Sequence, residues 1–457
     1  MNKLSKEIFK AYDIRGIVGK TVTVESTRLI GQAIGSEAIE RKVTRVVIGR
    51  DGRLSGPELS EALADGLRAA GVDVIDIGRV ATPMLYFATH HLGTQSGVMV
   101  TGSHNPPEYN GLKMVLAGDT LAGDDIQALY QRIVDDRLLQ GAGALETADV
   151  TEAYFDRITS DIKLDRPISV VVDCGNGVAG AFAPILFRRL GCRVRELFCD
   201  VDGTFPNHHP DPAKPENLRD VIEALAKTDA EIGLAFDGDG DRLGVVTKDG
   251  NIIWPDRQLM LYAADVLERN PKAKVIYDVK STRLLKPWIK ENKGTPVMCR
   301  TGHSFIKAKI KETGALIAGE MSGHVFFKER WYGFDDGMYA GARLLEILAR
   351  VEDASALLNA LPNAVSTPEL NLKTKEGENH ALIERLQQSA RFDAAEEVIT
   401  LDGLRVEYAD GFGLMRASNT TPVIVLRFEA DDQQALERIM ADFRRELGKA
   451  TDAKLPF

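Results

Sequence analysis

Asp237, Asp239 and Asp241 alternate with glycines directly after an apolar run that is typical of a buried strand. The glycines let the backbone fold back, so that alternate carboxylates can converge on one cation. Carboxylate oxygens in this number suit a hard ion such as Mg²⁺ better than a soft metal. A solvated Asp-Gly turn is the alternative, but the strict alternation favours a metal site. A calcium-binding EF-hand loop is excluded, because Arg242 and Lys248 occupy positions that need glycine and glutamate.

Ser103 lies in the sequence TGSHNP, just after an apolar run at residues 97–100. Pro106 ends regular structure there, so the serine is expected at an exposed turn. The nucleophile elbow of α/β-hydrolases is excluded, because Thr101 and Asn105 stand where that motif has glycine. Taken alone, the segment is typical of a polar turn. Its chemical interest depends on the other polar loops of the chain.

Two further loops carry groups that can bind a sugar phosphate. The sequence RASNTTP at residues 416–422 combines a guanidinium with hydroxyl and amide side chains, which suits a phosphate as well as it suits a hydrogen-bonded turn. The sequence GEMSGH at residues 319–324 offers a carboxylate, a hydroxyl and an imidazole, a set able to bind sugar hydroxyls. Each loop by itself is a weak signal.

Gly175, Gly177 and Gly180 match the glycine pattern of a dinucleotide-binding turn, with Glu196 about 20 residues further on. The alternative is a tight turn from a strand into a helix, and we favour it because no other motif requires a dinucleotide. An NAD-dependent dehydrogenase built on residues 175–180 is therefore kept as a less favoured function.

The composition is that of a soluble globular chain with several domains. The 457 residues carry a formal net charge of −10 and include four cysteines without metal-ligand spacing. The acidic balance argues against nucleic acid and membrane surfaces as partners. No uncharged stretch approaches the ~20 apolar residues of a membrane span, and no signal region opens the chain, so we expect a cytoplasmic protein.

Apolar runs alternate with helical patterns over most of the chain, which predicts α/β units with parallel or mixed sheets. The runs are residues 43–49, 168–173, 231–236, 274–278 and 315–318, and a helix is expected at 57–70. The last part differs, with strands at 401–408 and 422–429 before an amphipathic helix at 432–447, and is predicted as a smaller α+β unit. A Gly/Ala-rich stretch at 140–150 is the expected first linker. We predict four domains, at 1–148, 149–251, 252–365 and 366–457.

These motifs, together with the segment YDIRG at residues 12–16, resemble the α-D-phosphohexomutase family in order and spacing, and most closely its bacterial phosphomannomutase/phosphoglucomutase branch. The likeness covers essentially the whole chain. Gly102 stands where many members have alanine, which leaves the serine intact. The resemblance implies three α/β domains and a smaller C-terminal domain around a central cleft, each contributing one loop.

The resemblance also implies an activity: reversible interconversion of hexose 1-phosphate and hexose 6-phosphate, of mannose or glucose or both. The reaction would pass through a phosphoserine and a hexose 1,6-bisphosphate, with one Mg²⁺ per chain and glucose 1,6-bisphosphate or a similar activator. The partner would be a small sugar phosphate, and we expect a monomer, with a dimer as the alternative. A phosphoglucosamine mutase and a catalytically idle sugar-phosphate binding protein are the competing functions.

The resemblance assigns a role to each motif residue. Ser103 would carry the phosphoryl group and, with Asp237, Asp239 and Asp241, would hold Mg²⁺. The catalytic set would be Ser103, Arg15, His104, Lys113, Arg242 and His303, of which His104, Lys113 and His303 are candidate acids and bases. A catalytic lysine needs a lowered pKa, which Arg15 could cause, although Lys113 could equally be a counter-charge for phosphate. The substrate-binding set would be Tyr12, Lys280, Gly302, Glu320, Ser322, His324, Arg416, Ser418, Asn419 and Thr420.

Overall fold

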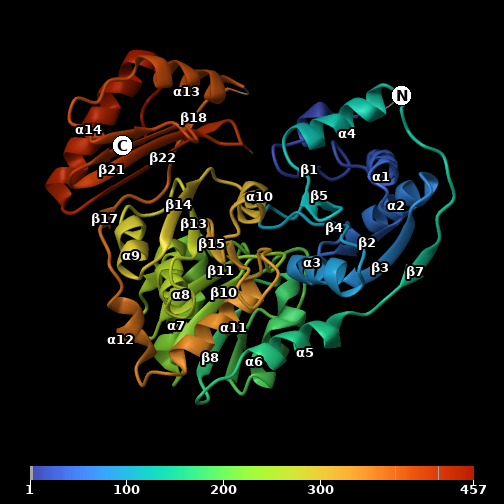
Figure 1. Ribbon diagram of the computed structural model, residues 1–457, viewed down its shortest axis with the longest axis horizontal. Coiled ribbons are helices and arrows are strands. Elements are labelled where there is room, and N and C mark those ends of the chain that lie inside the picture. The colour runs from blue at the N-terminus through green and yellow to red at the C-terminus, as the bar shows by residue number, and fades with distance from the viewer. Residues whose placement is uncertain (1–3, 376, 420) are drawn as a thin grey trace.

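The structure is a computed structural model that describes residues 4–375, 377–419 and 421–457. It contains four sheets, each with its own helices, which we call units I to IV in chain order (Figure 1). The predicted fold class, α/β units followed by an α+β unit, is confirmed. Short 3₁₀ helices complete the elements: η1 (Lys6–Ile8), η2 (Val178–Ala181) and η3 (Pro215–Leu218).

Unit I has the strand order β1-β5-β4-β2-β3-β7, with β6 paired to β5. β2 runs parallel to β3 and β4, whereas β5 runs antiparallel to β1 and β4. Alternate residues of β2 enter different cores, so α1 and α2 cover one face of the sheet and α3 the other. The elements are β1 (Ile14–Ile17), α1 (Val24–Glu40), β2 (Arg45–Arg50), α2 (Gly56–Ala69), β3 (Asp73–Arg79), α3 (Thr82–His91), β4 (Gly97–Val100), β5 (Tyr109–Leu116), β6 (Asp119–Thr120), α4 (Asp124–Val134) and β7 (Leu145–Thr147).

The stretch expected as a linker, at 140–150, contains a short strand. β7 pairs in parallel with β3 as the edge of the first sheet. The glycines there serve close packing: a Cβ on Gly141 would lie 2.6 Å from Gly71 Cα, and one on Gly143 would lie 1.9 Å from Val72 O. The Gly/Ala-rich composition therefore reflects a tight backbone approach and not a free connection.

Units II and III are also mixed sheets, and their central strands, such as β8, β10 and β13, are buried. Unit II has the order β12-β11-β10-β8-β9 and unit III the order β14-β13-β15-β16. Unit II consists of α5 (Thr151–Asp161), β8 (Ser169–Asp173), α6 (Ala183–Arg189), β9 (Arg193–Leu197), α7 (Arg219–Lys227), β10 (Ile232–Phe236), β11 (Leu243–Thr247) and β12 (Ile252–Ile253). Unit III consists of α8 (Pro255–Arg269), β13 (Lys274–Asp278), α9 (Leu285–Glu291), β14 (Thr295–Cys299), α10 (His303–Thr313), β15 (Ile317–Gly319), β16 (Val325–Phe327), α11 (Gly337–Leu348) and α12 (Ala354–Asn359).

Unit IV is an antiparallel sheet of order β17-β22-β21-β20-β19, with β18 paired to β22. Two helices pack on it and close a separate core. Its elements are β17 (Val365–Ser366), β18 (Leu370–Lys373), α13 (Glu378–Ser389), β19 (Glu397–Ile399), β20 (Leu404–Tyr408), β21 (Gly411–Ala417), β22 (Val423–Ala430) and α14 (Gln433–Ala450).

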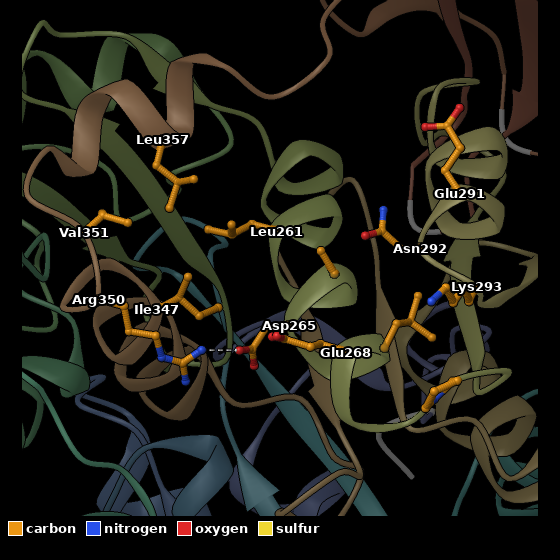
Figure 2. Close-up of a pocket in the computed structure, with 13 residues that line it drawn as sticks. Leu261, Asp265, Glu268, Glu291, Asn292, Lys293, Ile347, Arg350, Val351 and Leu357 are labelled. Atoms are coloured by element: carbon orange, nitrogen blue, oxygen red, sulfur yellow. Dashed lines mark hydrogen bonds and ion pairs between the residues drawn. The ribbon is translucent and has the colours of Figure 1, made fainter.

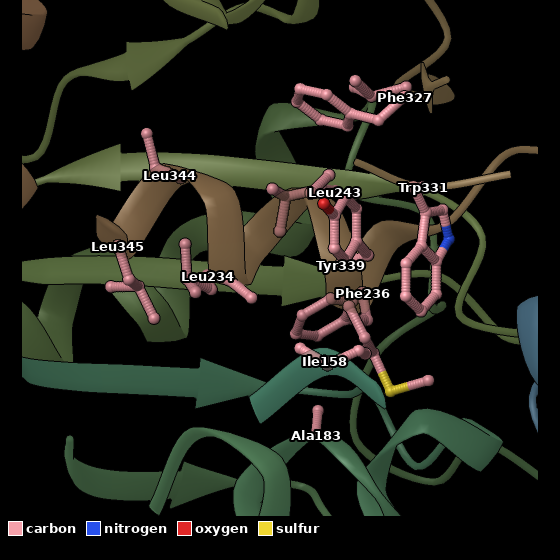
Figure 3. Close-up of a cluster of buried hydrophobic side chains, with 14 of the residues drawn as sticks. Ile158, Ala183, Leu234, Phe236, Leu243, Phe327, Trp331, Tyr339, Leu344 and Leu345 are labelled. Carbon is pink, nitrogen blue, oxygen red and sulfur yellow. The ribbon is translucent and has the colours of Figure 1, made fainter. Parts of the chain in front are cut away.

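One hydrophobic core joins units I, II and III. In Figure 3, Tyr339 and Leu344 of α11 lie against Leu234 and Phe236 of β10, so a helix that follows the third sheet covers the second. The same core continues through Trp331 toward α3 of unit I. The first three units therefore share a hydrophobic core, whereas unit IV has its own.

Candidate active site

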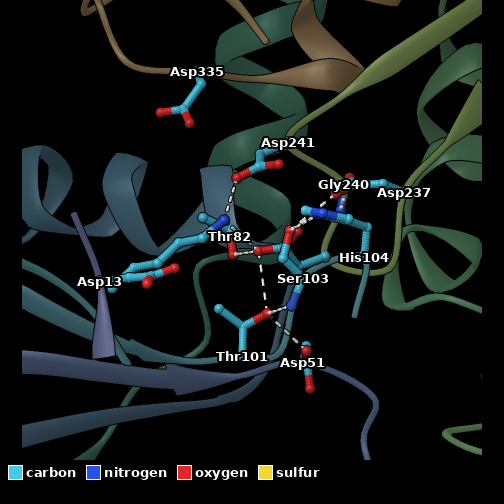
Figure 4. A network of polar contacts seen from close by, with 12 residues as sticks. Asp13, Asp51, Thr82, Thr101, Ser103, His104, Asp237, Gly240, Asp241 and Asp335 are labelled. Atoms are coloured by element: carbon cyan, nitrogen blue, oxygen red, sulfur yellow. Dashed lines mark hydrogen bonds and ion pairs between the residues drawn. The ribbon is translucent and has the colours of Figure 1, made fainter. Parts of the chain in front are cut away.

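Ser103 lies directly after β4 on a turn that the structure forces into an unusual conformation. Its φ is 49°, in the left-handed region that non-glycine residues rarely adopt. Its backbone N–H donates to Thr101 Oγ1 at 2.8 Å, and its hydroxyl donates to Asp237 Oδ2 at 3.2 Å. Ser103 Oγ also lies 3.2 Å from His104 Nδ1 (Figure 4). The serine is thus held with its Oγ beside both an imidazole and the aspartate loop.

The aspartate loop follows β10, as the sequence predicts, and its three carboxylates converge. Asp237, Asp239 and Asp241 are fully buried, with one oxygen of each within 4.8 Å of the others. The backbone N–H groups of Gly240 and Arg242 both donate to Asp237 Oδ1 at 3.1 Å, which closes the loop on itself. A side chain at residue 238 would collide with the serine turn, because a Cβ there would lie 2.3 Å from the Ser103 carbonyl oxygen.

This donor set fits a hard divalent cation. Asp239 Oδ1 is buried and accepts no hydrogen bond from any residue that the structure describes. Burial, and then the charges of Asp241 and Asp239, raise the pKa of Asp237 well above its usual value. A buried cluster of like charges with an unused carboxylate oxygen is stabilised by a cation. Asp237, Asp239, Asp241 and the Ser103 oxygen would hold Mg²⁺, which would neutralise charge on a phosphoryl group there.

Lys113 belongs to the same cluster, but not with the lowered pKa that the sequence suggested. Its Nζ lies 2.8 Å from Asp239 Oδ2 and 2.5 Å from Asp241 Oδ2. Burial lowers the pKa of Lys113, yet the two carboxylates outweigh both burial and Arg15, and the pKa is raised. The expected lowering by Arg15 is therefore wrong for this arrangement, because that like charge acts more weakly than the two ion pairs.

Two arginines flank the serine turn from opposite sides. Arg15, on β1, donates to Asn105 Oδ1 at 2.5 Å and pairs with Asp13 at 2.5 Å. Arg242, at the end of the aspartate loop, lies 3.9 Å from carboxylate oxygens of both Asp237 and Asp211. Both guanidinium groups are thus close to the position that a phosphoryl group on Ser103 would occupy.

The loop at 319–324 extends this cluster into unit III. His324 Nδ1 lies 3.1 Å from Glu320 Oε2 and 3.0 Å from Ser322 Oγ, and its Nε2 lies 3.3 Å from Asp241 Oδ1. Burial lowers the pKa of His324, but Asp241 and Glu320 outweigh it and raise the pKa to about 9. His324 is therefore a cation near pH 7 that joins the aspartate loop to the loop with Glu320. Glu320 Oε1 also accepts from the Gly302 N–H at 2.5 Å.

His104 and His303 are neutral imidazoles. Burial, followed by nearby cations, lowers the pKa of each well below its usual value. A neutral imidazole can accept a proton, which a general base must do. His303 lies edge-on to Tyr12, with ring centroids 5.4 Å apart. Tyr12 also contacts the first turn of α10, where Ser304 Oγ donates to the Tyr12 carbonyl oxygen at 3.4 Å.

The remaining expected phosphate-binding residues lie on or beside unit IV. Arg416, on β21, is buried and donates from Nε to Asp402 Oδ2 at 3.0 Å. Ser418 Oγ lies 3.0 Å from Thr421 Oγ1, and Asn419 follows on the same turn. Lys280, after β13, donates to Glu369 Oε2 at 3.0 Å. Thr420, also expected here, lies outside the described residues.

Several residues that support the site were not predicted from the sequence. Asp51 accepts from Thr101 Oγ1 at 2.8 Å, and Arg53 donates to the Ser103 carbonyl oxygen at 2.8 Å. Thr82 donates to Asp239 Oδ2 at 2.6 Å. A signal for the first two existed, because the sequence DGR follows a predicted strand just as the aspartate loop does. The partners of Arg416 and Lys280 had no such signal.

The glycines at 175–180 are explained by packing. A Cβ on Gly177 would lie 3.0 Å from the Gly238 backbone, and one on Gly180 would lie 2.1 Å from the Cys199 carbonyl oxygen. The Val178 N–H donates to the Gly238 carbonyl oxygen at 3.1 Å. This turn therefore supports the aspartate loop, and its surface is covered by the chain's own backbone.

A cavity of about 510 Å³ lies elsewhere, among α8, α9, α11 and α12 (Figure 2). Apolar side chains such as Leu261 and Ile347 line it together with Asp265 and Arg350. None of the residues predicted for the active site lines this cavity. Among the described helices, none combines the length and apolar character needed to cross a membrane.

Comparison with known proteins covers the chain from end to end. Four profiles match in order: phosphoglucomutase/phosphomannomutase α/β/α domain I at residues 6–139, domain II at 152–250, domain III at 254–365 and the C-terminal domain at 369–446. A phosphoglucomutase of Neisseria gonorrhoeae is 62% identical over 447 residues, which are 97% of each chain. A phosphomannomutase/phosphoglucomutase of Pseudomonas aeruginosa is 57% identical over 454 residues, 99% of this chain and 98% of the other.

Solved structures agree with this result. A phosphoglucomutase/phosphomannomutase family protein of Burkholderia thailandensis superimposes with a TM-score of 0.95 at 63% identity and covers all of both chains. The order of the four profiles matches units I to IV, and the expected family resemblance is confirmed. The chain belongs to the phosphoglucomutase/phosphomannomutase family.

Proposed function

We propose that this chain is a hexose phosphate mutase, which interconverts hexose 1-phosphate and hexose 6-phosphate of glucose, of mannose or of both. The observation that carries the proposal is the position of Ser103 Oγ, 3.2 Å from the carboxylate of Asp237 in the buried aspartate loop. A serine that donates and accepts a phosphoryl group needs a cation site and an acid/base group beside its oxygen, and both are adjacent.

The chemistry consists of two phosphoryl transfers that mirror each other. In the first, the bond between Ser103 Oγ and phosphorus breaks while a free sugar hydroxyl forms a bond to the same phosphorus. The hydroxyl proton passes to a base, for which His104 and His303 are the neutral candidates. In the second, the other phosphoryl group returns to Ser103 Oγ, and the proton is given back to the departing sugar oxygen.

The surrounding residues supply charge stabilisation and orientation. Arg15 and Arg242 would stabilise the charge spread over the transferred oxygens, since phosphoryl transfer depends chiefly on positioning and cationic groups. Glu320 would accept hydrogen bonds from sugar hydroxyls, Ser322 could accept or donate them, and His324 would donate them. Arg416, with Ser418 and Asn419, would hold the phosphate that is not reacting, together with Lys280 and the loop at Gly302.

Replacement of Ser103 tests the proposal directly. Ser103→Ala should lose interconversion of hexose 1- and 6-phosphates while keeping the folded state, because the side chain is small and contributes only two hydrogen-bonded contacts. Ser160→Ala, at an exposed helix position, is the matched control and should keep full activity. Near-normal turnover of Ser103→Ala would contradict the role of Ser103. Mass spectrometry of the parent protein should find phosphate on this residue.

A side-by-side assay of glucose, mannose and glucosamine 1-phosphates, with Mg²⁺ and a hexose bisphosphate activator, tests the substrate class. We expect turnover of the glucose or mannose compound, or both, to exceed that of the glucosamine compound. Fastest turnover of glucosamine 1-phosphate would favour the phosphoglucosamine mutase alternative instead. The activator requirement, a monomeric state and a cytoplasmic location stay predictions.

The metal is tested separately. Asp239→Asn removes one carboxylate charge from the aspartate loop. It should lower the affinity for Mg²⁺, so that activity responds less to Mg²⁺ at a given concentration. A chelator should abolish turnover of the parent protein, and added Mg²⁺ should restore it. Full activity in the presence of chelator would refute the metal site but would not contradict the role of Ser103.

A further inference from the structure

Both cations that are expected to hold the non-reacting phosphate are already paired with a carboxylate. Arg416 Nε donates to Asp402 Oδ2 at 3.0 Å, and Lys280 Nζ donates to Glu369 Oε2 at 3.0 Å. Neither carboxylate belongs to a motif that the sequence singled out. A phosphate that reaches these cations therefore meets a negative charge directly behind each of them.

The first pair is built into a junction between units. Asp402 lies on the turn between β19 and β20, and its Oδ2 also accepts from the Thr301 N–H of unit III at 3.0 Å. Thr301 is followed by Gly302, whose N–H donates to Glu320. Asp402 Oδ2 thus holds Arg416 beside the segment Thr301-Gly302, which in turn is bonded to Glu320 of the loop at 319–324.

The two pairs differ in how far water screens them. The side chains of Arg416 and Asp402 are 5% and 12% exposed, whereas those of Lys280 and Glu369 are 11% and 45% exposed. Charges in a largely buried pair act on each other, and on an incoming anion, more strongly than charges in contact with solvent. Asp402 should therefore influence phosphate binding more than Glu369.

These pairs are not needed to hold unit IV on unit III, because other arginines do so. Arg405 donates to the carbonyl oxygens of Val279 and Ser281 at 2.7 and 2.6 Å. Arg427 donates to the Lys280 carbonyl oxygen at 2.5 Å and to Asp256 Oδ2 at 3.2 Å. The interface thus has strong contacts that involve neither Asp402 nor Glu369.

In the proposed reaction, the carboxylates beside Arg416 and Lys280 would help the phosphate to dissociate. One serine serves both ends of the sugar, so the bisphosphate intermediate must release its phosphate from the unit IV loop, turn around and bind again in the other orientation. Cations that held a phosphate at full strength would slow this release, since an ion pair excluded from water dissociates slowly. Partial neutralisation shortens the time for which the phosphate is held.

We propose that Asp402 and Glu369 are positioning residues that orient Arg416 and Lys280 while weakening their hold on phosphate, so that the bisphosphate intermediate can turn around. This inference rests on the proposed mutase function. It predicts that removal of either negative charge strengthens binding of sugar phosphates and slows turnover. Loss of a merely structural contact would have the opposite effect on binding.

The test compares Asp402→Asn and Glu369→Gln, which keep a hydrogen-bond acceptor for the cation but remove its counter-charge. Asp410→Asn is the matched control, because Asp410 pairs with Arg438 on the exposed side of the same unit. Steady-state assays should give a KM for hexose 1-phosphate lowered about tenfold in Asp402→Asn and about threefold in Glu369→Gln, with kcat lowered in both. The control should keep the parent's KM and kcat.

A second readout is the concentration of glucose 1,6-bisphosphate that gives half-maximal activation, which should fall in both variants because the bisphosphate escapes less often. An unchanged or raised KM in both active variants would overturn the inference. If Asp402→Asn does not fold, Glu369→Gln alone decides, because its half-exposed carboxylate can be neutralised without leaving a buried charge. Failure of the mutase proposal would look different, since the parent protein itself would then not interconvert the substrates.

Discussion

Arg53 is predicted to hold the phosphoryl-accepting serine in position, although it does not touch the reacting oxygen. Its guanidinium is almost fully buried and donates to four carbonyl groups between Ser103 and Tyr109, in the segment that joins β4 to β5. The acceptors are the carbonyl oxygens of Ser103, Asn105, Pro106 and Tyr109, at 2.8, 2.6, 2.6 and 2.8 Å. Such contacts keep Ser103 in the left-handed backbone conformation that directs its Oγ to Asp237.

The substitution Arg53→Lys retains the charge but not the planar arrangement of donors. The lysine ammonium is one nitrogen and can reach only some of the four carbonyl oxygens. We therefore expect about two of these oxygens to lose their hydrogen-bond donor. Each orphaned buried acceptor costs about 1–3 kcal/mol, so two of them give a loss of about 2–6 kcal/mol in unfolding free energy. Freed from these contacts, the turn can shift, and a displacement of about 1 Å at a reacting group lowers the rate about 100-fold.

Initial rates over a range of hexose 1-phosphate concentrations, with urea unfolding of the same samples, check this prediction. We expect kcat to fall about 100-fold with KM nearly unchanged, because Arg53 does not face the sugar-binding loops. Arg45→Lys is the control, since Arg45 makes an exposed ion pair with Glu146 and should leave both quantities unaltered. A kcat of Arg53→Lys within about twofold of the parent would refute the reasoning.

Further predictions concern packing and charge. Gly238→Ala should reduce activity and Mg²⁺ affinity, measured by rates in a metal titration, because the new Cβ would push the aspartate loop away from the Ser103 carbonyl oxygen. Arg343→Met should lower the unfolding free energy by about 1–3 kcal/mol in urea, because it removes a buried cation from Asp265 and Glu329, which keep only the more exposed Arg269 and Arg350. Burial raises the pKa of Asp336 to about 7, so the folded state retains this proton and the associated stability is lost as pH rises from about 4 to about 7. Asp336→Asn keeps an acceptor for Tyr154 and should raise Tm relative to the parent at pH 8 but not near pH 4.

Buried strands were the part of the fold that the sequence predicted best. The strands expected at 97–100 and 274–278 occur with those bounds, because each is a short apolar run between clear turn signals. Two short edge strands, β7 and β12, were not predicted, since few residues of either are buried and no apolar pattern marks them. The Gly/Ala-rich stretch before unit II lies between the first two domain profiles, as a linker should, but its pairing with β3 was not predicted. Glycine that permits flexibility and glycine that permits close approach look alike in a sequence.

The candidate site divides in the same way. Ser103, the aspartate loop and Glu320 could be found because each follows a strand end, where a sheet presents polar side chains together. What the sequence could not supply is the charge environment, which depends on residues far apart in the chain. Lys113 pairs with Asp239 and Asp241, residues more than a hundred positions away, and this reverses the direction of the expected pKa shift.

The counter-charges of the phosphate-binding cations show why this limit matters for function. From the sequence, Arg416 is a candidate phosphate ligand, since a guanidinium beside hydroxyl groups suits an oxyanion. The fold pairs this guanidinium with Asp402, which also accepts a hydrogen bond from Thr301 of another unit, so the group proposed to bind phosphate takes part in a contact between two units. A single residue type in a motif therefore indicates what can be bound, whereas its partner in the fold determines how firmly it is held and how readily it is released. For the proposed mutase, whose intermediate would have to turn around, we therefore expect release of phosphate to influence the rate as well as its binding.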